Sequence, residues 1–176
     1  MKRIFTLFAL LLLLVLQHSN SNAQTFKSKY AVNAGIGVGT FGFAGNGGLP
    51  FTASVERTFA DNISAGVNLA YVQTKYDFDI KYSYLVFGAR GSYHFNELLK
   101  INNPQFDVYG GAGLLYRHYK IKYTGDLEDY GTATSGGDID VALHAGVRYL
   151  FTDKIGVHAE LGYGISPLQL GVAFVF

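Results

Sequence analysis

The residues best suited to catalysis or metal binding are two histidines and a glutamate in the C-terminal third of the chain. His144, His158 and Glu160 alternate with apolar residues, so they share one side of the extended segments that contain them. A histidine beside a carboxylate is the pairing that a hydrolytic or metal site requires. Nucleophilic catalysis also needs a serine within reach of the base, and the sequence places no serine beside these histidines. With Arg148 on the same side, the pattern favours a hydrogen-bonded polar interior over an active site.

A second candidate is an acidic stretch within the segment 119–137. Asp126, Glu128 and Asp129 stand close together beside Tyr130, and Asp138 follows the segment. Oxygen ligands at this density suit Ca²⁺ or Mg²⁺. The stretch lacks the D-x-D-x-D-G order of a calcium loop, so a solvated acidic loop is the favoured interpretation. The sequence predicts no metal ligand, no cofactor-binding residue and no catalytic residue.

A third candidate is the run Gly37-Val38-Gly39-Thr40-Phe41-Gly42, which fits the pattern G-x-G-x-x-G. A dinucleotide site needs a helix directly after these glycines, because the helix N-terminus holds the pyrophosphate. The residues that follow, 43–48, have no helical period. The glycines therefore indicate a bending strand and a narrow interior.

The composition excludes several classes of protein. Of the 176 residues, 49% are hydrophobic and 15% are charged, whereas charged residues form about 25% of a typical soluble domain. Thirteen Tyr and 14 Phe argue against intrinsic disorder. A formal net charge of +1 gives no electrostatic basis for binding nucleic acid. The absence of Cys excludes disulfides, thiolate zinc sites and thiol catalysis.

Residues 1–23 are predicted to be a cleaved signal peptide. Lys2 and Arg3 precede the apolar run Ile4–Leu16, and Ser21-Asn22-Ala23 resembles the A-x-A cleavage pattern. At ~1.5 Å rise per residue the run is too short for a ~30 Å bilayer core, which argues against a transmembrane helix. One mature domain is expected over 24–176.

From Tyr30 onward the sequence alternates with a period of two, which predicts strands. Large apolar residues form one row, while the opposite row is small or polar and rich in Gly. Eight such segments follow one another, at about 30–39, 51–59, 63–71, 84–95, 106–117, 139–151, 155–163 and 168–176. Each has about the ~9–11 residues with which a tilted strand crosses a bilayer.

Two further details favour a membrane over water around the bulky row. The lysines of the mature chain are expected outside the strands, at positions 27, 29, 75, 81, 100, 120, 122 and 154. Charges of both signs stand on the small-residue row, where they can pair inside a narrow lumen: Glu56, Arg90, Asp107, Arg117, Asp140, Arg148 and Glu160. Arg57 is the exception on the bulky row, near a strand end from which it can snorkel to the interface.

Aromatic residues gather near both ends of the segments, as expected where rings settle at headgroup depth. One group comprises Phe59, Phe95, Phe106, Tyr149, Phe151 and Phe176. The opposite group comprises Tyr71, Tyr116 and Tyr163. Two such girdles flanking an aliphatic band indicate a transmembrane barrel.

The connections also fall into two sets. Segments 60–62, 96–105 and 152–154 join strands on the side of both termini, which is expected to be periplasmic. Segments 41–50, 74–83, 119–137 and the short 164–167 are expected to be extracellular. Segment 74–83 mixes aromatic and charged residues, so it is either an adhesive loop tip or a strand extension beyond the membrane surface.

These features resemble the small eight-stranded outer-membrane β-barrel family of OmpX and the OmpA membrane domain, over Tyr30–Phe176. The most specific element is the alternating end Leu168, Leu170, Val172, Phe174 and Phe176. It resembles the family's C-terminal signal for the barrel assembly machinery. The hairpin at 149–157 resembles the family's hairpin pattern as well.

The resemblance implies an all-β protein, an eight-stranded antiparallel up-and-down transmembrane β-barrel in the cell outer membrane. Its implied partners are outer-membrane lipids and lipopolysaccharide, and the assembly machinery through the Phe176 segment, around a monomeric barrel.

Eight strands leave an interior just wide enough for side chains. The expected function is therefore that of a non-enzymatic barrel with a plugged polar lumen, contributing to envelope integrity or to surface interaction through its extracellular loops. Three alternatives stay open: a small barrel hydrolase acting on lipid or peptide at the rim, a narrow solute channel, and a soluble eight-stranded binding barrel, which would need a bulky ligand cavity inside.

Overall fold

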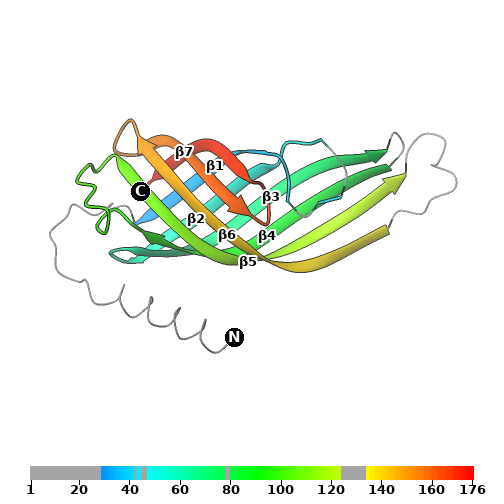
Figure 1. Ribbon diagram of the computed structural model, residues 1–176, viewed down its shortest axis with the longest axis horizontal. Coiled ribbons are helices and arrows are strands. Elements are labelled where there is room, and N and C mark those ends of the chain that lie inside the picture. The colour runs from blue at the N-terminus through cyan, green and yellow to red at the C-terminus, as the bar shows by residue number, and fades with distance from the viewer. Residues whose placement is uncertain (1–28, 42, 45–46, 78–79, 124–133) are drawn as a thin grey trace, which may run out of the picture.

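The computed structural model describes residues 29–41, 43–44, 47–77, 80–123 and 134–176. They form eight strands, each antiparallel to the next in the chain, which close into one barrel (Figure 1). The strands are β1 (Tyr30–Val38), β2 (Phe51–Ala60), β3 (Ile63–Asp77), β4 (Ile80–His94), β5 (Phe106–Tyr123), β6 (Thr134–Leu150), β7 (Ile155–Tyr163) and β8 (Leu168–Val175). Within these residues no helix has both the length and the apolar character needed to cross a membrane.

The barrel is closed by β8, which returns to β1 in a continuous antiparallel register from Ala31↔Val175 to Val38↔Leu168. At the end of this seam Tyr30 and Phe176 exchange backbone hydrogen bonds of 3.0 and 2.9 Å. The predicted eight-stranded up-and-down barrel is confirmed. We call the end of the barrel that carries Tyr30 and Phe176 the terminal end, and the opposite end the projecting end.

The two rows of each strand face the sides that the sequence predicts. Leu143 and Leu161 on the bulky row point outward, with 57% and 62% of their surface exposed. On the inner row Glu56 and Arg148 are 2% and 0% exposed. A water-soluble barrel of this size fills its interior with large apolar side chains, so this inverted arrangement suits a hydrocarbon surrounding.

Exposed aromatic side chains mark both ends of the outer surface, as predicted. At the terminal end the rings of Phe106 and Tyr149 lie 5.2 Å apart between centroids. The guanidinium of Arg57 lies 5.4 Å from the ring centroid of Phe59 and 5.9 Å from that of Tyr30. Arg57 therefore rests among interfacial rings, which is where a snorkelling arginine is stable in a bilayer.

The strands differ in length, and here the sequence prediction is wrong in its boundaries. Strands β3–β6 have 15, 15, 18 and 17 residues, whereas the other four have 8 to 10. The four long strands project beyond the rest of the barrel (Figure 1). In these parts the outward row is polar, so the apolar row that identifies a membrane strand is missing. Strand pairing nevertheless continues, with Ile80 and Ile121 on the inner row.

We call the parts of β3–β6 that extend beyond the other strands the projecting sheet. It agrees with one of the two interpretations of segment 74–83 and corrects two other expectations. The described parts of segment 74–83 are strand extensions, with Lys75 paired to Lys81 in register. Four lysines expected outside the strands lie within them, at positions 75, 81, 120 and 122. The segment expected as a loop over 119–137 is also strand at both ends, because Tyr123 closes β5 and Thr134 begins β6.

Candidate functional site

The barrel interior contains a layer of buried charged and polar side chains nearer the terminal end and a layer of apolar side chains nearer the projecting end. Both layers are built from the inner row, since alternate residues of every strand point to the barrel axis. The polar layer, which we call the charge layer, comprises Asn33, Glu56, Ser64, Arg90, His94, Asp107, Tyr109, Arg148 and Glu160. Ion pairs inside a barrel must be complete, because an unpaired charge away from water is costly.

Arg148 on β6 lies at the centre of the charge layer and is fully buried. Its Nε donates to Asn33 Oδ1 at 3.0 Å, and its Nη1 donates to Asp107 Oδ2 at 2.5 Å. Its Nη2 donates to Glu56 Oε1 at 3.1 Å, and its guanidinium carbon lies 3.9 Å from the ring centroid of Tyr109. One side chain thereby joins β6 to β1, β2 and β5 across the lumen.

Arg90 on β4 forms the second centre of the charge layer. It donates to both carboxylate oxygens of Glu160, with Nη2–Oε2 at 2.7 Å and Nη1–Oε1 at 3.3 Å. Its Nε lies 3.3 Å from Glu56 Oε1, so Glu56 is shared with Arg148. Tyr109 Oη donates to Glu160 Oε2 at 3.1 Å. The two arginines are therefore linked into one network that spans the barrel.

His94, Ser64 and Asp107 form a hydrogen-bonded chain in the same layer. His94 Nδ1 lies 2.7 Å from Asp107 Oδ1, and His94 Nε2 lies 3.0 Å from Ser64 Oγ. This is the connectivity of a serine hydrolase triad. However, Ser64 donates its proton to Glu56 Oε2 at 2.7 Å, and Asp107 is also bound to Arg148. Ser64 is 2% exposed and His94 4%, so a substrate carbonyl has no access to the hydroxyl.

Contrary to the expectation from the sequence, a serine lies beside His144. Ser92 Oγ is 2.8 Å from His144 Nε2, although the two residues lie on β4 and β6. Both are paired in register with Gly111 on the intervening β5. A Cβ atom at Gly111 would approach His144 Cε1 to 2.9 Å, so the glycine leaves the space in which the two side chains meet. No sequence spacing signals a contact that crosses two strands.

The histidine and glutamate that the sequence singled out near the C-terminus do not form a catalytic pair. Glu160 binds Arg90 and Tyr109, as described above. His158, 5% exposed, lines a cavity of about 20 Å³ together with Asn68 and Gln169. That volume is enough for one water molecule and too small for a substrate. Among the described residues, no three His, Asp or Glu side chains gather as a metal site would require.

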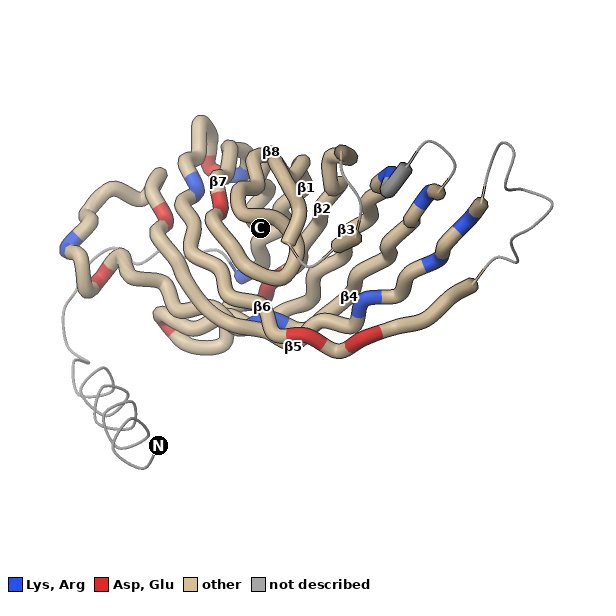
Figure 2. The backbone as a smooth tube through the Cα atoms, turned by 45° about the vertical axis from the view of Figure 1, so that its right-hand side comes forward, with Lys and Arg blue, Asp and Glu red and all other residues tan. Residues whose placement is uncertain are grey.

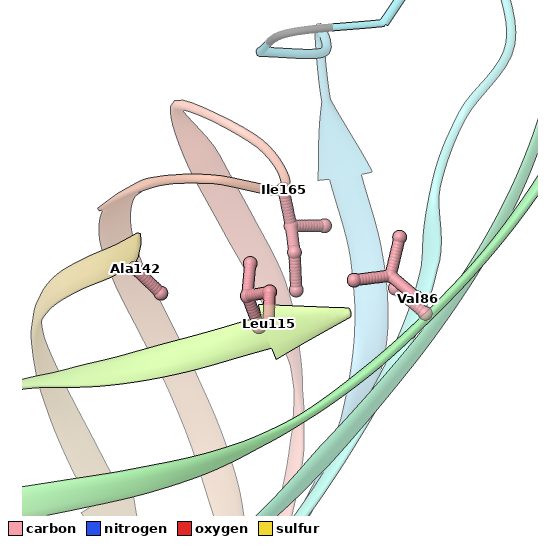
Figure 3. Close-up of a cluster of buried hydrophobic side chains, with 5 residues drawn as sticks. Val86, Leu115, Ala142 and Ile165 are labelled. Atoms are coloured by element: carbon pink, nitrogen blue, oxygen red, sulfur yellow. The ribbon is translucent and has the colours of Figure 1, made fainter. Parts of the chain in front are cut away.

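The apolar layer lies above the charge layer toward the projecting end and comprises Ala70, Val86, Leu115, Ala142 and Ile165. Figure 3 shows Ile165, from the connection between β7 and β8, directed at Leu115. Leu115 is 1% exposed and Ile165 6%. Residues 164–167, expected from the sequence to be a short turn outside the barrel, instead direct Ile165 inward, after a positive φ of 106° at Gly164.

The connection between β1 and β2 also enters the barrel. Thr74 Oγ1 donates to the carbonyl of Ala44 at 2.5 Å, and the backbone N–H of Ala44 donates to Tyr84 Oη at 2.9 Å. Phe43 packs edge-on against Tyr84 at 4.6 Å, with the Arg117 guanidinium 4.7 Å from its ring centroid. The glycine run 37–42 therefore leads into a plug at the mouth, and in its described part no helix follows the glycines.

The acidic candidates are only partly within the described residues. Asp126, Glu128, Asp129 and Tyr130 lie outside them. Asp138 is on β6, paired in register with Arg117, and Arg117 Nη2 donates to Asp140 Oδ2 at 2.9 Å. These two aspartates are thus part of the sheet and not of a loop.

Comparison with known proteins agrees with this architecture. The family model described as "Outer membrane protein beta-barrel domain" matches residues 7–170. The chain belongs to this outer-membrane β-barrel family. The predicted resemblance is confirmed, and the outer membrane of a Gram-negative envelope is the location of this barrel. No curated protein matches the chain.

Two solved structures show the same fold as this outer-membrane barrel. The N-terminal β-barrel domain of Pseudomonas aeruginosa OprF is similar with a TM-score of 0.56 and 18% identity, covering 85% of this chain and 98% of that one. Neisserial surface protein A (NspA) is similar with a TM-score of 0.55 and 16% identity, covering 84% and 94%. At these identities the likeness extends to the fold alone.

Proposed function

We propose that this outer-membrane barrel is a non-enzymatic envelope protein whose lumen is closed to solutes and whose projecting sheet interacts at the cell surface. The observation that carries the proposal is Arg148, which is fully buried and holds β1, β2, β5 and β6 together across the barrel axis. A permeable channel needs a wetted path past this point. The charge layer instead fills the cross-section with side chains bound to one another.

The apolar layer supports closure as a second barrier. Ions and polar solutes that passed the charge layer would next meet Leu115 and Val86, which are 1% and 0% exposed. These apolar side chains offer no hydrogen bonds to replace those that the solutes make with water. Phe43 from the first connection packs against the same layer. Two successive barriers of opposite chemistry favour a structural role over a diffusion pore.

The burial of Ser64, His94 and Asp107 supports the non-enzymatic assignment. A hydrolase needs its nucleophile at a surface that a substrate reaches and near donors for an oxyanion. Ser64 instead lies in the charge layer, where its hydroxyl binds Glu56. Its removal is expected to change stability without changing turnover of any lipid or peptide.

Export and insertion belong to the same proposal. We expect removal of residues 1–23, so that the mature chain starts at Gln24, and recognition of the exposed Phe176 end by the barrel assembly machinery. Amino-terminal sequencing of the protein from outer membranes tests the first expectation. Loss of membrane assembly on deletion of Phe176, with export to the periplasm retained, tests the second.

Ion conductance in planar bilayers tests closure directly. The wild-type barrel is expected to give no steady conductance at either polarity, and Arg148→Ala combined with Leu115→Ala, which removes the central side chain of each layer, is expected to give measurable conductance if it folds. Arg57→Ala, which removes an exposed arginine of the outer surface, is the matched control and should stay closed. A steady open level in the wild-type protein would instead establish the narrow-channel alternative.

A further inference from the structure

Lysines form a row across the outer face of the projecting sheet. Lys75 on β3 is the register partner of Lys81 on β4, and Lys81 is the partner of Lys122 on β5. Lys120 lies one outward position nearer the barrel, opposite Ser83. All four lysines are exposed. Figure 2 shows Lys and Arg along the projecting parts of β3–β5.

No acidic side chain that the structure describes lies on this face. Its other described outward side chains near the lysines are neutral or histidine: Gln73, Ser83, His118 and Ser135. Asp138 and Asp140 alternate with the outward-facing Ile139 and Val141, so they lie on the opposite face, together with Arg117. Among the side chains that the structure describes, the outer face of the projecting sheet carries only positive charge.

No described side chain on this face neutralises the positive charge of the lysine row. Side chains directly opposite one another on antiparallel strands are only about 4.5–5.5 Å apart at Cβ, and like charges at that spacing repel. An anion between the ammonium groups removes the repulsion. Each ammonium offers three hydrogen-bond donors, and phosphate is a group that lysine binds well as a point charge.

The four lysines also lie at a defined distance beyond the hydrocarbon core of the membrane. Lys75, Lys81 and Lys120 each stand two outward positions beyond the exposed apolar side chains Tyr71, Leu85 and Tyr116. At ~3.3 Å per residue that separation is about 13 Å along the strand, or about 9 Å along the membrane normal for a tilt near 45°. Because interfacial tyrosines settle at headgroup depth, the ammonium groups reach the charged part of the lipid headgroups.

We propose that Lys75, Lys81, Lys120 and Lys122 bind the phosphate groups of anionic lipid headgroups in the outer leaflet. The proposal rests on the outward orientation of the projecting end in the proposed function. The site fixes the barrel in depth and holds headgroups against one side of the projecting sheet, leaving its aromatic inner face, with Tyr82 and Tyr84, free of lipid.

Lipid selectivity measured by electron spin resonance tests the site. The full mature barrel is reconstituted in phosphatidylcholine vesicles that contain spin-labelled phosphatidic acid or spin-labelled phosphatidylcholine. The motionally restricted fraction of each label gives its relative association with the protein. The wild-type barrel is expected to prefer phosphatidic acid by at least about fivefold, because one lysine near an anionic surface increases the association by about that factor. This preference should fall as the salt concentration rises.

The triple variant Lys75→Gln, Lys81→Gln, Lys122→Gln is expected to lose most of that preference. The matched control is Lys29→Gln, Lys100→Gln, Lys154→Gln, which removes three exposed lysines from the terminal end and should retain it. Slower migration after boiling verifies that both variants are folded. Equal loss in the control, or no preference in the wild type, overturns the proposal.

Inorganic phosphate separates the two sources of the ligand. Phosphate added at an ionic strength matched by chloride should leave the lipid preference unchanged, and displacement by phosphate alone would overturn the headgroup assignment in favour of a free anion. Closure is measured separately by conductance, so a failure here leaves the proposed closed lumen standing.

Discussion

The charge layer and the apolar layer close the same barrel by opposite means. In the charge layer every contact depends on strand register, because Arg148 reaches partners on β1, β2 and β5 that are far away in sequence. In the apolar layer Ala70, Val86, Leu115 and Ala142 come from strands, but Ile165 and Phe43 fold inward from connections to complete it. Strands therefore suffice to place the charges, whereas the mouth also needs chain that leaves the sheet.

Shortening a side chain should therefore lower the stability of the barrel by different amounts in the two layers. Removing one member of a buried ion-pair network leaves its partners charged and unpaired, which costs more than the interaction itself contributes. Removing apolar atoms costs the transfer free energy and a cavity, and neighbouring side chains can partly relax into that space. Four substitutions, ordered by expected effect, test this difference.

Arg148→Ala should have the largest effect, lowering the free energy of unfolding by about 3–5 kcal/mol. The change leaves the buried carboxylate of Asp107 without its arginine and leaves Glu56 with Arg90 as its one remaining arginine partner among the described residues. Urea titration of the barrel in vesicles, followed by the shift in gel migration of unboiled samples, measures the loss.

A compensated variant sharpens that result. Arg148→Met combined with Glu56→Gln and Asp107→Asn removes charge of both signs from the layer, and it should recover most of the stability that Arg148→Ala loses. If the triple variant is no more stable than Arg148→Ala, unpaired charge is not the reason for the loss.

Leu115→Ala should have the next largest effect, lowering the free energy of unfolding by about 2–4 kcal/mol, because Leu115 is almost fully buried in the apolar layer. The same titration applies, and Leu114→Ala on the lipid-facing side of the same strand is the control. A loss larger than that of Arg148→Ala would reverse the ranking of the two layers.

Ser64→Ala should lower the free energy of unfolding by about 1–2 kcal/mol, the cost of leaving buried polar atoms without a hydrogen bond. Both Glu56 and His94 lose a contact to the serine hydroxyl. Thermal denaturation monitored by circular dichroism gives the stability change. Hydrolysis of fluorogenic ester and peptide substrates by the wild type, abolished in the variant, would contradict a purely structural role.

Asp140→Asn should have the smallest effect, below about 1 kcal/mol. The Asp140 side chain is 28% exposed, so its pair with Arg117 is screened by solvent. The salt dependence of unfolding is the sensitive measurement: the small wild-type advantage should vanish at high ionic strength.

Sequence reasoning predicts the barrel well because its signal is local. The side chains of Leu143 and Glu160 face outward and inward for the same reason, that successive residues of a strand point to opposite sides. Strand ends are harder to predict in the projecting sheet, where Lys75 and Lys122 continue the pairing after the apolar row has stopped.

The sequence by itself determined the number of strands, the face that lipid covers and the residues that line the lumen, since period and residue type act along the chain. Only the tertiary structure decided which of those lining residues meet. His144 contacts Ser92, and Arg90 holds Glu160, because register and barrel closure bring distant strands to one level. Those distances follow from hydrogen bonds between strands, which the spacing of residues in one chain does not encode.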